Sequence, residues 1–155
     1  MISARHIKQN IQSGFTLLEV LLVVAIIAIL AGIVIVAINP AKNLGDTRNS
    51  QRSSDVNAIL SAASQYTLDN NALPAGITAV PTEICATSAT TCTGLVDLTP
   101  LTTAGKYLSV LPKDPQCATL CAPNGIGYKI SKDTSDLITV TAPFAEQGKT
   151  ISVTK

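Results

Sequence analysis

Glu19 has the most unusual chemical setting in this sequence. It is the single ionisable side chain in a run of 24 largely apolar residues, from Phe15 to Ile38. An isolated carboxylate at membrane depth costs about 2.5–3.5 kcal/mol or more, so such a group usually has a charged partner. No lysine or arginine lies within the run. Cleavage between Gly14 and Phe15 would supply a partner, because it would free the α-amino group of Phe15 about one helical turn from Glu19.

Four cysteines form the second group of reactive side chains. Cys85 and Cys92 enclose six residues, and Cys117 and Cys121 enclose three. These spacings match no common zinc motif well, and a domain that follows a membrane segment would lie outside the reducing cytoplasm. We therefore expect two local disulfides, Cys85–Cys92 and Cys117–Cys121. The crossed pairings and a zinc site are the alternatives, since four cysteines permit three connectivities.

The rest of the composition argues against catalysis. His6 is the only histidine, and cleavage after Gly14 would remove it together with Arg5 and Lys8. The mature chain would then have no imidazole for a catalytic triad, a metal site or a proton shuttle. Its nine basic and ten acidic side chains would give a net charge near −1, and five Phe and Tyr residues offer little stacking surface. We predict neither an enzyme nor a nucleic-acid-binding protein, although chemistry by carboxylates alone stays compatible with this composition.

The apolar run is long enough to cross a membrane. As a helix it would rise about 36 Å, against a hydrocarbon core of roughly 30 Å. Residues 1–14 are short, polar and free of acidic side chains. A secretory signal peptide would place its cleavage site after its apolar region, whereas the expected cut here lies before it. An uncleaved signal anchor is the alternative with the same composition.

Charge alone does not fix the orientation of this segment. Arg5 and Lys8 favour a cytoplasmic amino terminus, but Lys42, Arg48 and Arg52 lie on the other side of the run within range of the positive-inside rule. The cysteines favour a carboxy-terminal domain outside the cytoplasm, because disulfides persist there.

Residues 14–32 closely resemble the amino-terminal signature of type IV pilins and type II secretion pseudopilins. The residues that match position by position are Gly14, Phe15, Thr16, Leu17, Leu18 and Glu19. The resemblance implies that a prepilin peptidase cuts after Gly14 and methylates the new terminal Phe15. It also implies that Glu19 meets the amino terminus of a neighbouring subunit during filament assembly.

The same resemblance implies a set of partners and a location. The chain would be a single-pass prepilin in the cytoplasmic membrane with its amino terminus inside, and then an extracytoplasmic filament subunit. Its partners would be copies of itself, the prepilin peptidase and methyltransferase, and an assembly platform protein. A pilus, a secretion pseudopilus and a DNA-uptake filament are not separable from the sequence. A monomeric membrane-anchored binding domain is the alternative outside the filament class.

The sequence departs from the family pattern near the end of the apolar run. Ala28 stands where the family often has glycine and Val36 where it often has proline, so a helix break should lie further along, near Asn39 and Pro40. Pro40 cannot donate a helical hydrogen bond and disfavours the helical conformation at Asn39. We expect a bend or a locally unwound segment in one continuous stem, as the resemblance implies. The alternative is that one helix ends and a second begins with Pro40 in its first turn.

From Asp46 to about Asn70 the pattern becomes that of an amphipathic helix. Its apolar face comprises Val56, Ile59, Leu60 and Ala63. The residues expected on its other faces are Arg52, Asp55, Asn57 and Ser61. We expect the apolar face to be the core of a small domain and to be covered by a sheet.

The carboxy-terminal part alternates as strands do, with Tyr128 and Ile130 on one face. Two further groups alternate in the same way: one comprises Ile138, Val140 and Ala142, and the other Ile151 and Val153. Turn residues separate them at 132–136 and 146–149. We predict three antiparallel strands, preceded by a short helical turn at 98–104 and by the proline-framed segment 111–115, which resembles a pseudopilin motif.

The predicted fold is α+β, a pilin-like lollipop in which a long helix, first transmembrane and then amphipathic, packs on a small antiparallel sheet. Its segments are a leader at 1–14, a transmembrane and filament-core helix at 15–38, and a soluble domain at 39–155. Within that domain we expect helix to about residue 70, loops at 71–125 and the sheet at 126–155.

No cofactor is expected, although some pseudopilins carry a structural calcium in the carboxy-terminal region. Oxygen-bearing side chains near one another in this part of the sequence are Asp114, Asn124, Asp133 and Asp136. No D-x-D-x-D-G calcium loop is present, and solvated turns explain these residues equally well.

Overall fold

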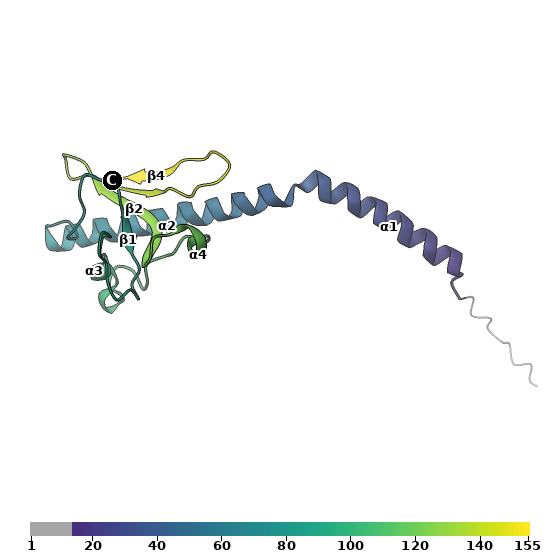
Figure 1. Ribbon diagram of the computed structural model, residues 1–155, viewed down its shortest axis with the longest axis horizontal. Coiled ribbons are helices and arrows are strands. Elements are labelled where there is room, and N and C mark those ends of the chain that lie inside the picture. The colour runs from purple at the N-terminus through teal and green to yellow at the C-terminus, as the bar shows by residue number, and fades with distance from the viewer. Residues whose placement is uncertain (1–13) are drawn as a thin grey trace, which may run out of the picture. The chain divides into compact units, whose positions relative to one another are not determined.

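The computed structural model describes residues 14–155 in two compact units, one ending at Pro40 and one spanning Ala41–Lys155 (Figure 1). The expectations for Arg5, His6 and Lys8, and for most of the leader, lie outside the described residues.

Helix α1 spans Leu17–Ile38 and makes up most of the first unit. Thr16 is in an extended conformation before it, and its hydroxyl oxygen accepts a hydrogen bond from the backbone N–H of Glu19 at 3.2 Å. This is a standard amino-terminal cap, which satisfies one of the free donors of the first turn. None of the 22 residues of the helix is buried, and an 18-residue window within it has a mean hydropathy of 3.4. By length and composition it is a candidate membrane span.

The helical path breaks at Asn39. This residue has the left-handed conformation (φ 47°, ψ 76°), and helix α2 begins at the next residue and spans Pro40–Asn70. Helix α1 thus ends at Ile38 and α2 starts with Pro40 in its first turn, as the two-helix alternative has it. Pro40 fits the first position of a helix, where its missing N–H costs nothing, and asparagine is among the residues that adopt a left-handed conformation most readily. The break lies beyond Val36, as expected.

The second unit is built on α2 and a four-stranded antiparallel sheet. The strands are β1 (Thr82–Cys85), β2 (Gly125–Lys132), β3 (Ile138–Ala142) and β4 (Ile151–Thr154), paired in that order. The expected apolar face of α2 is buried, with Val56, Ile59 and Ala63 fully inaccessible. It belongs to one hydrophobic cluster with Tyr128, Ile130 and Val140 of the sheet. The α+β prediction is confirmed.

Strand β1 corrects the expectation of three strands. It is only four residues long and lies within the predicted loop region, and its pairing with β2 shifts register between Glu83 and Cys85. The Glu83 carboxylate accepts hydrogen bonds from the backbone N–H groups of Gly127 (2.9 Å) and Ala122 (3.3 Å). A bulged strand this short has no readable alternation, so sequence periodicity could not identify it.

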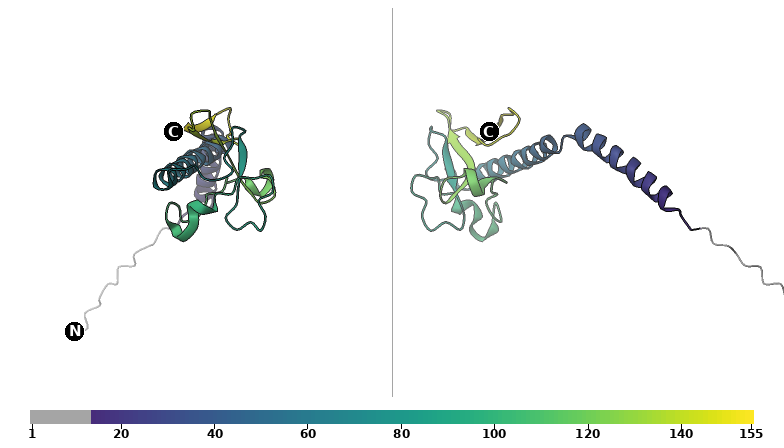
Figure 2. Two further views of the ribbon diagram at one scale, coloured as in Figure 1. Left: turned by 90° about the vertical axis from the view of Figure 1, so that its left-hand side faces the viewer. Right: turned by 45° about the vertical axis from the view of Figure 1, so that its right-hand side comes forward.

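The connecting segments follow the expectations in part. The predicted helical turn is α3 (Thr99–Thr102), which continues as a 3₁₀ turn at Thr103–Gly105. A second short helix, α4 (Cys117–Leu120), was not expected. Both predicted strand connections are turns, and each contains a residue with positive φ, Asp136 in the first and Gln147 in the second. The two further views in Figure 2 show the sheet from other sides.

Candidate functional site

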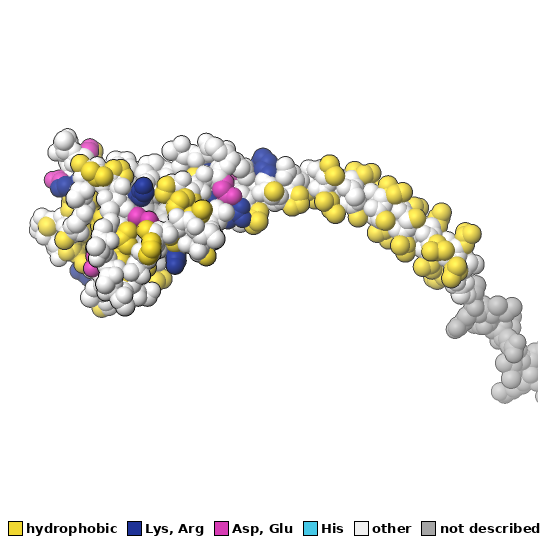
Figure 3. Space-filling view, viewed as in Figure 1, with side chains coloured by type: hydrophobic (Ala, Val, Ile, Leu, Met, Phe, Trp, Pro, Cys, Tyr) yellow, Lys and Arg dark blue, Asp and Glu magenta, His cyan; other side chains and the backbone are white. Residues whose placement is uncertain are grey.

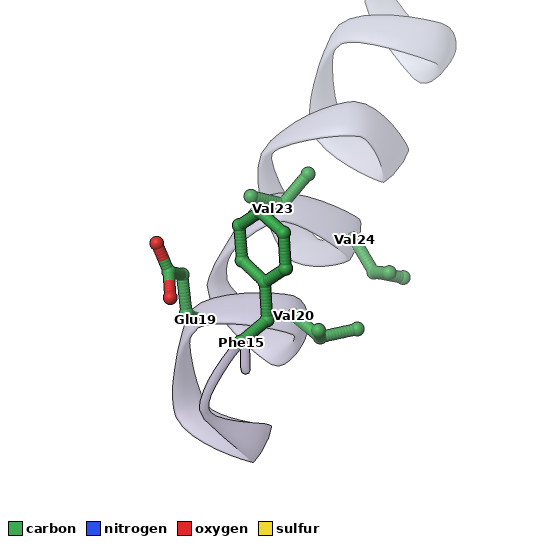
Figure 4. A pocket seen from close by; sticks show the side chains of 5 residues that line it. All are labelled: Phe15, Glu19, Val20, Val23 and Val24. Atoms are coloured by element: carbon green, nitrogen blue, oxygen red, sulfur yellow. The ribbon is translucent and has the colours of Figure 1, made fainter. Parts of the chain in front are cut away.

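The carboxylate of Glu19 projects from the first turn of α1. Figure 4 shows the Phe15 ring lying along the helix toward Val23, while the Glu19 side chain extends to another side. These residues, with Val20 and Val24, line a shallow apolar hollow. Within residues 14–155, no group donates a hydrogen bond to the Glu19 carboxylate or forms an ion pair with it. The charge therefore needs a partner from elsewhere.

The whole surface of α1 is available for such a partner. Phe15 is 82% exposed, and the large apolar side chains along the helix are at least half exposed or nearly so. On the face seen in Figure 3, hydrophobic side chains cover this helix and the charged side chains lie over later residues. An apolar surface of this extent marks contact with lipid or with other proteins. A helix that is apolar on every side and carries one acid at its beginning is suited to a membrane and to packing among other helices.

The cysteines are joined in two local disulfides. Cys85 bonds to Cys92 and Cys117 to Cys121, and no cysteine in the described residues is free. This is the pairing expected from the sequence, and it differs from the crossed and zinc-bound alternatives. The first disulfide closes the loop after β1, and the second closes the turn of α4.

The four oxygen-bearing residues considered for calcium each bind a different partner within the chain. Both carboxylate oxygens of Asp114 bind Arg52, and the Asn124 amide donates to the backbone oxygen of Thr91 at 3.1 Å. A carboxylate oxygen of Asp133 accepts from two backbone N–H groups of its own turn, and Asp136 pairs with Lys132 at 2.7 Å. In the described part of the chain, no cluster of three or more His, Cys, Asp or Glu side chains could hold a metal ion.

Arg52 is the main correction to the sequence analysis. It was expected on a polar face of the helix, but its side chain is completely buried. Its guanidinium binds Asp114 through two bonds, Nε to Oδ2 at 2.7 Å and Nη2 to Oδ1 at 3.1 Å. It also donates to Glu146 Oε2 at 3.0 Å, to Gln116 Oε1 at 2.8 Å and to Asn49 Oδ1 at 3.2 Å. A planar guanidinium presents five N–H donors, and this site provides an acceptor for each of them.

Glu146 joins a second arginine to the same cluster. Arg48 donates to both of its carboxylate oxygens at 2.6 Å. Hydrogen bonds from Arg48 and then from Arg52 lower the pKa of Glu146 from its usual value of 4.5 to about 2. The bond to Asp114, followed by the bond to Glu146, raises the pKa of Arg52 above its ordinary value. Two arginines and two carboxylates thus balance one another between α2 and two distant loops.

Tyr128 and Asp55 form a second buried polar contact beside this cluster. The fully buried phenol of Tyr128 donates to Asp55 Oδ2 at 2.7 Å. Burial is the largest cause that raises the pKa of Asp55, and the hydrogen bond from Tyr128 opposes it. The pair satisfies a buried hydroxyl, which would otherwise cost free energy of folding.

Residues 9–35 match a family described as the prokaryotic N-terminal methylation motif. The chain carries the amino-terminal motif of the type IV pilin and pseudopilin family. It is also similar to the type II secretion system core protein G of Aeromonas hydrophila, with 43% identity over 63 residues. That match covers 41% of this chain and 43% of the relative, so the two are alike over less than half of either length. No solved structure matches the chain at a comparable level.

These similarities confirm the resemblance that was read from Gly14 to Glu19. Type IV pilins and pseudopilins are structural proteins and not enzymes, in agreement with the prediction from composition. Residues 17–35 of the matched segment lie on the exposed α1, and the disulfide-bonded α+β domain follows it. The motif and the apolar helix together are typical of a prepilin anchored in the inner membrane.

Proposed function

We propose that this chain is the structural subunit of a type IV pilus-like filament, made as a membrane-anchored prepilin. The observation that carries the proposal is that α1 buries none of its side chains and exposes a carboxylate, Glu19, that has no partner among residues 14–155 and lies within the methylation motif. In a monomer, only lipid could cover an apolar surface of this kind. A filament places the same helix among its copies.

The first step is cleavage after Gly14 and methylation of Phe15 by the prepilin peptidase. Gly14 is exposed and precedes the helix, which begins at Leu17. A peptidase needs extended backbone at the scissile bond, and this geometry supports such access. Cleavage produces an α-amino group at Phe15, and a methylated amine stays protonated near neutral pH. The new terminus is therefore a cation about one turn from Glu19.

The second step is packing of α1 against the same helix in other subunits. In lipid, helices associate by close van der Waals contact and by polar pairs, because lipid tails are as apolar as the helix surface. Ala28 and Gly32, four residues apart, allow helix backbones to approach closely. An ion pair between Glu19 of one subunit and the Phe15 amine of another would fix the register. The soluble domain would remain outside as the coat of the filament.

A pseudopilin of a type II secretion system is the second candidate. The similarity to core protein G favours it, although it covers 43% of that protein. Both candidates use the same prepilin peptidase and an assembly platform protein, and both polymerise through α1. They differ in the product, because a pilus reaches the cell surface and a pseudopilus stays short. Recovery of the protein in sheared surface material supports the pilus.

The test is Glu19→Ala in the full chain, followed by separation of polymer from membranes by centrifugation. We expect insertion and cleavage as in the unchanged chain, with loss of at least nine tenths of the pelletable polymer. The matched control is Asp69→Ala, which removes an exposed acid of α2 that pairs with Lys106 at 2.7 Å. Normal polymer from Glu19→Ala would overturn the proposed assembly mechanism.

A further inference from the structure

The first three turns of α2, residues 40–51, have an unfavourable sequence for a helix. They contain a proline, a glycine and two asparagines, which are poor helix formers, together with Thr, Ser and Asp. We call these residues the proximal segment. Its one large apolar side chain, Leu44, is 56% exposed. The only buried residues of the segment are Gly45 and Asn49.

Apolar packing therefore does not hold the proximal segment in place. Helices in proteins are stabilised mainly by burial of an apolar face. In α2 the first buried apolar side chain is Val56, more than a turn beyond the end of the segment. Within the described residues, the segment has polar contacts in place of a hydrophobic core.

Those polar contacts come from residues 143–150, the loop between β3 and β4. Glu146 binds the Arg48 guanidinium through two bonds of 2.6 Å. The Asn49 amide bonds to the Glu146 backbone twice, donating to its oxygen at 3.0 Å and accepting from its N–H at 2.9 Å. Gln147 Nε2 donates to the backbone oxygen of Lys42 at 2.6 Å, and Lys149 pairs with Asp46 at 2.7 Å. The loop thus contacts the proximal segment along most of its length (Figure 1).

Gly45 leaves room for one of these contacts, that of Gln147. A Cβ atom at that position would lie 2.5 Å from Gln147 Nε2, well inside contact distance. A glycine within a helix weakens it. The missing side chain at this position leaves room for the flexible end of the Gln147 side chain, which would otherwise have to shift.

The loop has a fixed shape at both ends. Ala142 at its start pairs with Ile151 at its end. Its turn is formed by Gln147 and Gly148, both with positive φ. The ends of the loop are therefore held by the pairing of β3 with β4 and not by the proximal segment.

We propose that the β3–β4 loop is a latch that keeps the proximal segment helical, and that its release lets this segment unwind while the rest of the domain stays folded. Unwinding should stop at Arg52, because that side chain is buried and held by Asp114 through two bonds. Extended chain advances up to about 3.3 Å per residue, against about 1.5 Å in a helix. Release would thus lengthen the connection between α1 and the domain. The latch does not depend on whether the filament is a pilus or a pseudopilus.

The test is hydrogen–deuterium exchange, read by mass spectrometry on the full chain in detergent micelles. Glu146→Ala removes the central contact of the latch. We expect exchange in peptides covering residues 43–50 to become at least tenfold faster, with exchange in β2 and β3 changed less than twofold. The matched control is Asp69→Ala, which removes a carboxylate that ties the far end of α2 to Lys106 and Tyr107. It should leave residues 43–50 unchanged.

Two outcomes would overturn the latch. One is unchanged exchange of residues 43–50 in Glu146→Ala. The other is acceleration that spreads equally over the whole domain, because the segment would then not open separately. If Glu146→Ala does not fold, Gln147→Ala and Lys149→Gln decide the matter, since each removes one contact at the surface. Faster exchange confined to the proximal segment supports the latch, and unchanged or domain-wide exchange contradicts it.

Discussion

Helices α1 and α2 follow one another in the chain, but they differ in the burial and in the partners of a charged side chain that each carries. In α1 every side chain is exposed, and the acid Glu19 has no partner among the described residues. In α2 the base Arg52 is completely buried, and each acceptor around it belongs to the same chain. A charge whose partners lie within the chain contributes to the fold. A charge without one, on an apolar surface, indicates an interface with another molecule.

The largest effect on stability is expected from Arg52. Arg52→Ala would leave Asp114 buried, at 3% exposure, without its cation. Removing one partner of a buried ion pair typically costs about 3–5 kcal/mol. Urea unfolding of the full chain in micelles, followed by circular dichroism, measures the loss. Lys132→Ala, which breaks an exposed pair with Asp136, is the control and should cost at most about 1 kcal/mol. A loss for Arg52→Ala as small as that of the control would contradict the structural role of the cluster.

The two helices can also be compared directly with one isoleucine from each. Ile59→Ala in α2 removes a fully buried side chain and should lower the free energy of unfolding of the domain by about 2–5 kcal/mol. Ile29→Ala in α1 truncates a side chain that is 65% exposed, and the domain should unfold at the same urea concentration as before. The Ile29 variant should instead weaken the polymer. Equal destabilisation of the domain by both changes would contradict the view that α2 stabilises the domain and that α1 contacts other molecules.

Each disulfide alone should contribute less to stability than Arg52 or Ile59 does. Each closes a short loop, with sequence separations of 7 and 4 residues, and such bonds contribute about 2–3 kcal/mol each. Urea unfolding with and without a reducing agent measures their sum. Because neither cysteine pair lies in α1, reduction should leave membrane insertion unchanged. Loss of insertion on reduction would contradict the independence of the two helices.

The smallest expected effect is the pH dependence due to Glu146. Its pKa in the folded chain is about 2, lowered from 4.5 chiefly by Arg48. A lowered pKa means that its contribution to stability is fully present above pH 4.5 and is lost as the pH falls through 2. Glu146→Gln removes this contribution, so the thermal midpoints of the two proteins should differ at pH 6 and converge at pH 2. Asp55 titrates in both proteins, so its raised pKa cancels in the comparison. A difference that stays constant with pH would argue against the Arg48–Glu146 pair.

Helix α1 was predicted from the sequence more completely than the buried polar cluster around Arg52 was. The features of α1, from Gly14 to Glu19 and on through the apolar run, are contiguous and need no tertiary information. The apolar face of α2 and strands β2 to β4 were also predictable, because their periodicity is local. The Arg52–Asp114 pair was not, since the two residues are 62 positions apart and a helical pattern assigns an arginine to solvent. One signal was present, namely an aspartate fixed between Pro112 and Pro115, which suggests a carboxylate held in one place.

The most direct test of the proposed function is the intact mass of the protein from membranes and from sheared surface material. A chain that begins at Phe15, with one added methyl group and four hydrogens missing, is the expected result. It would establish cleavage after Gly14, methylation and both disulfides in one measurement. Its presence in the sheared fraction would support a surface filament, and its absence there a secretion pseudopilus. A mass that still includes residues 1–14 would contradict the account, because Glu19 would then lack the terminal amine that the proposed assembly requires.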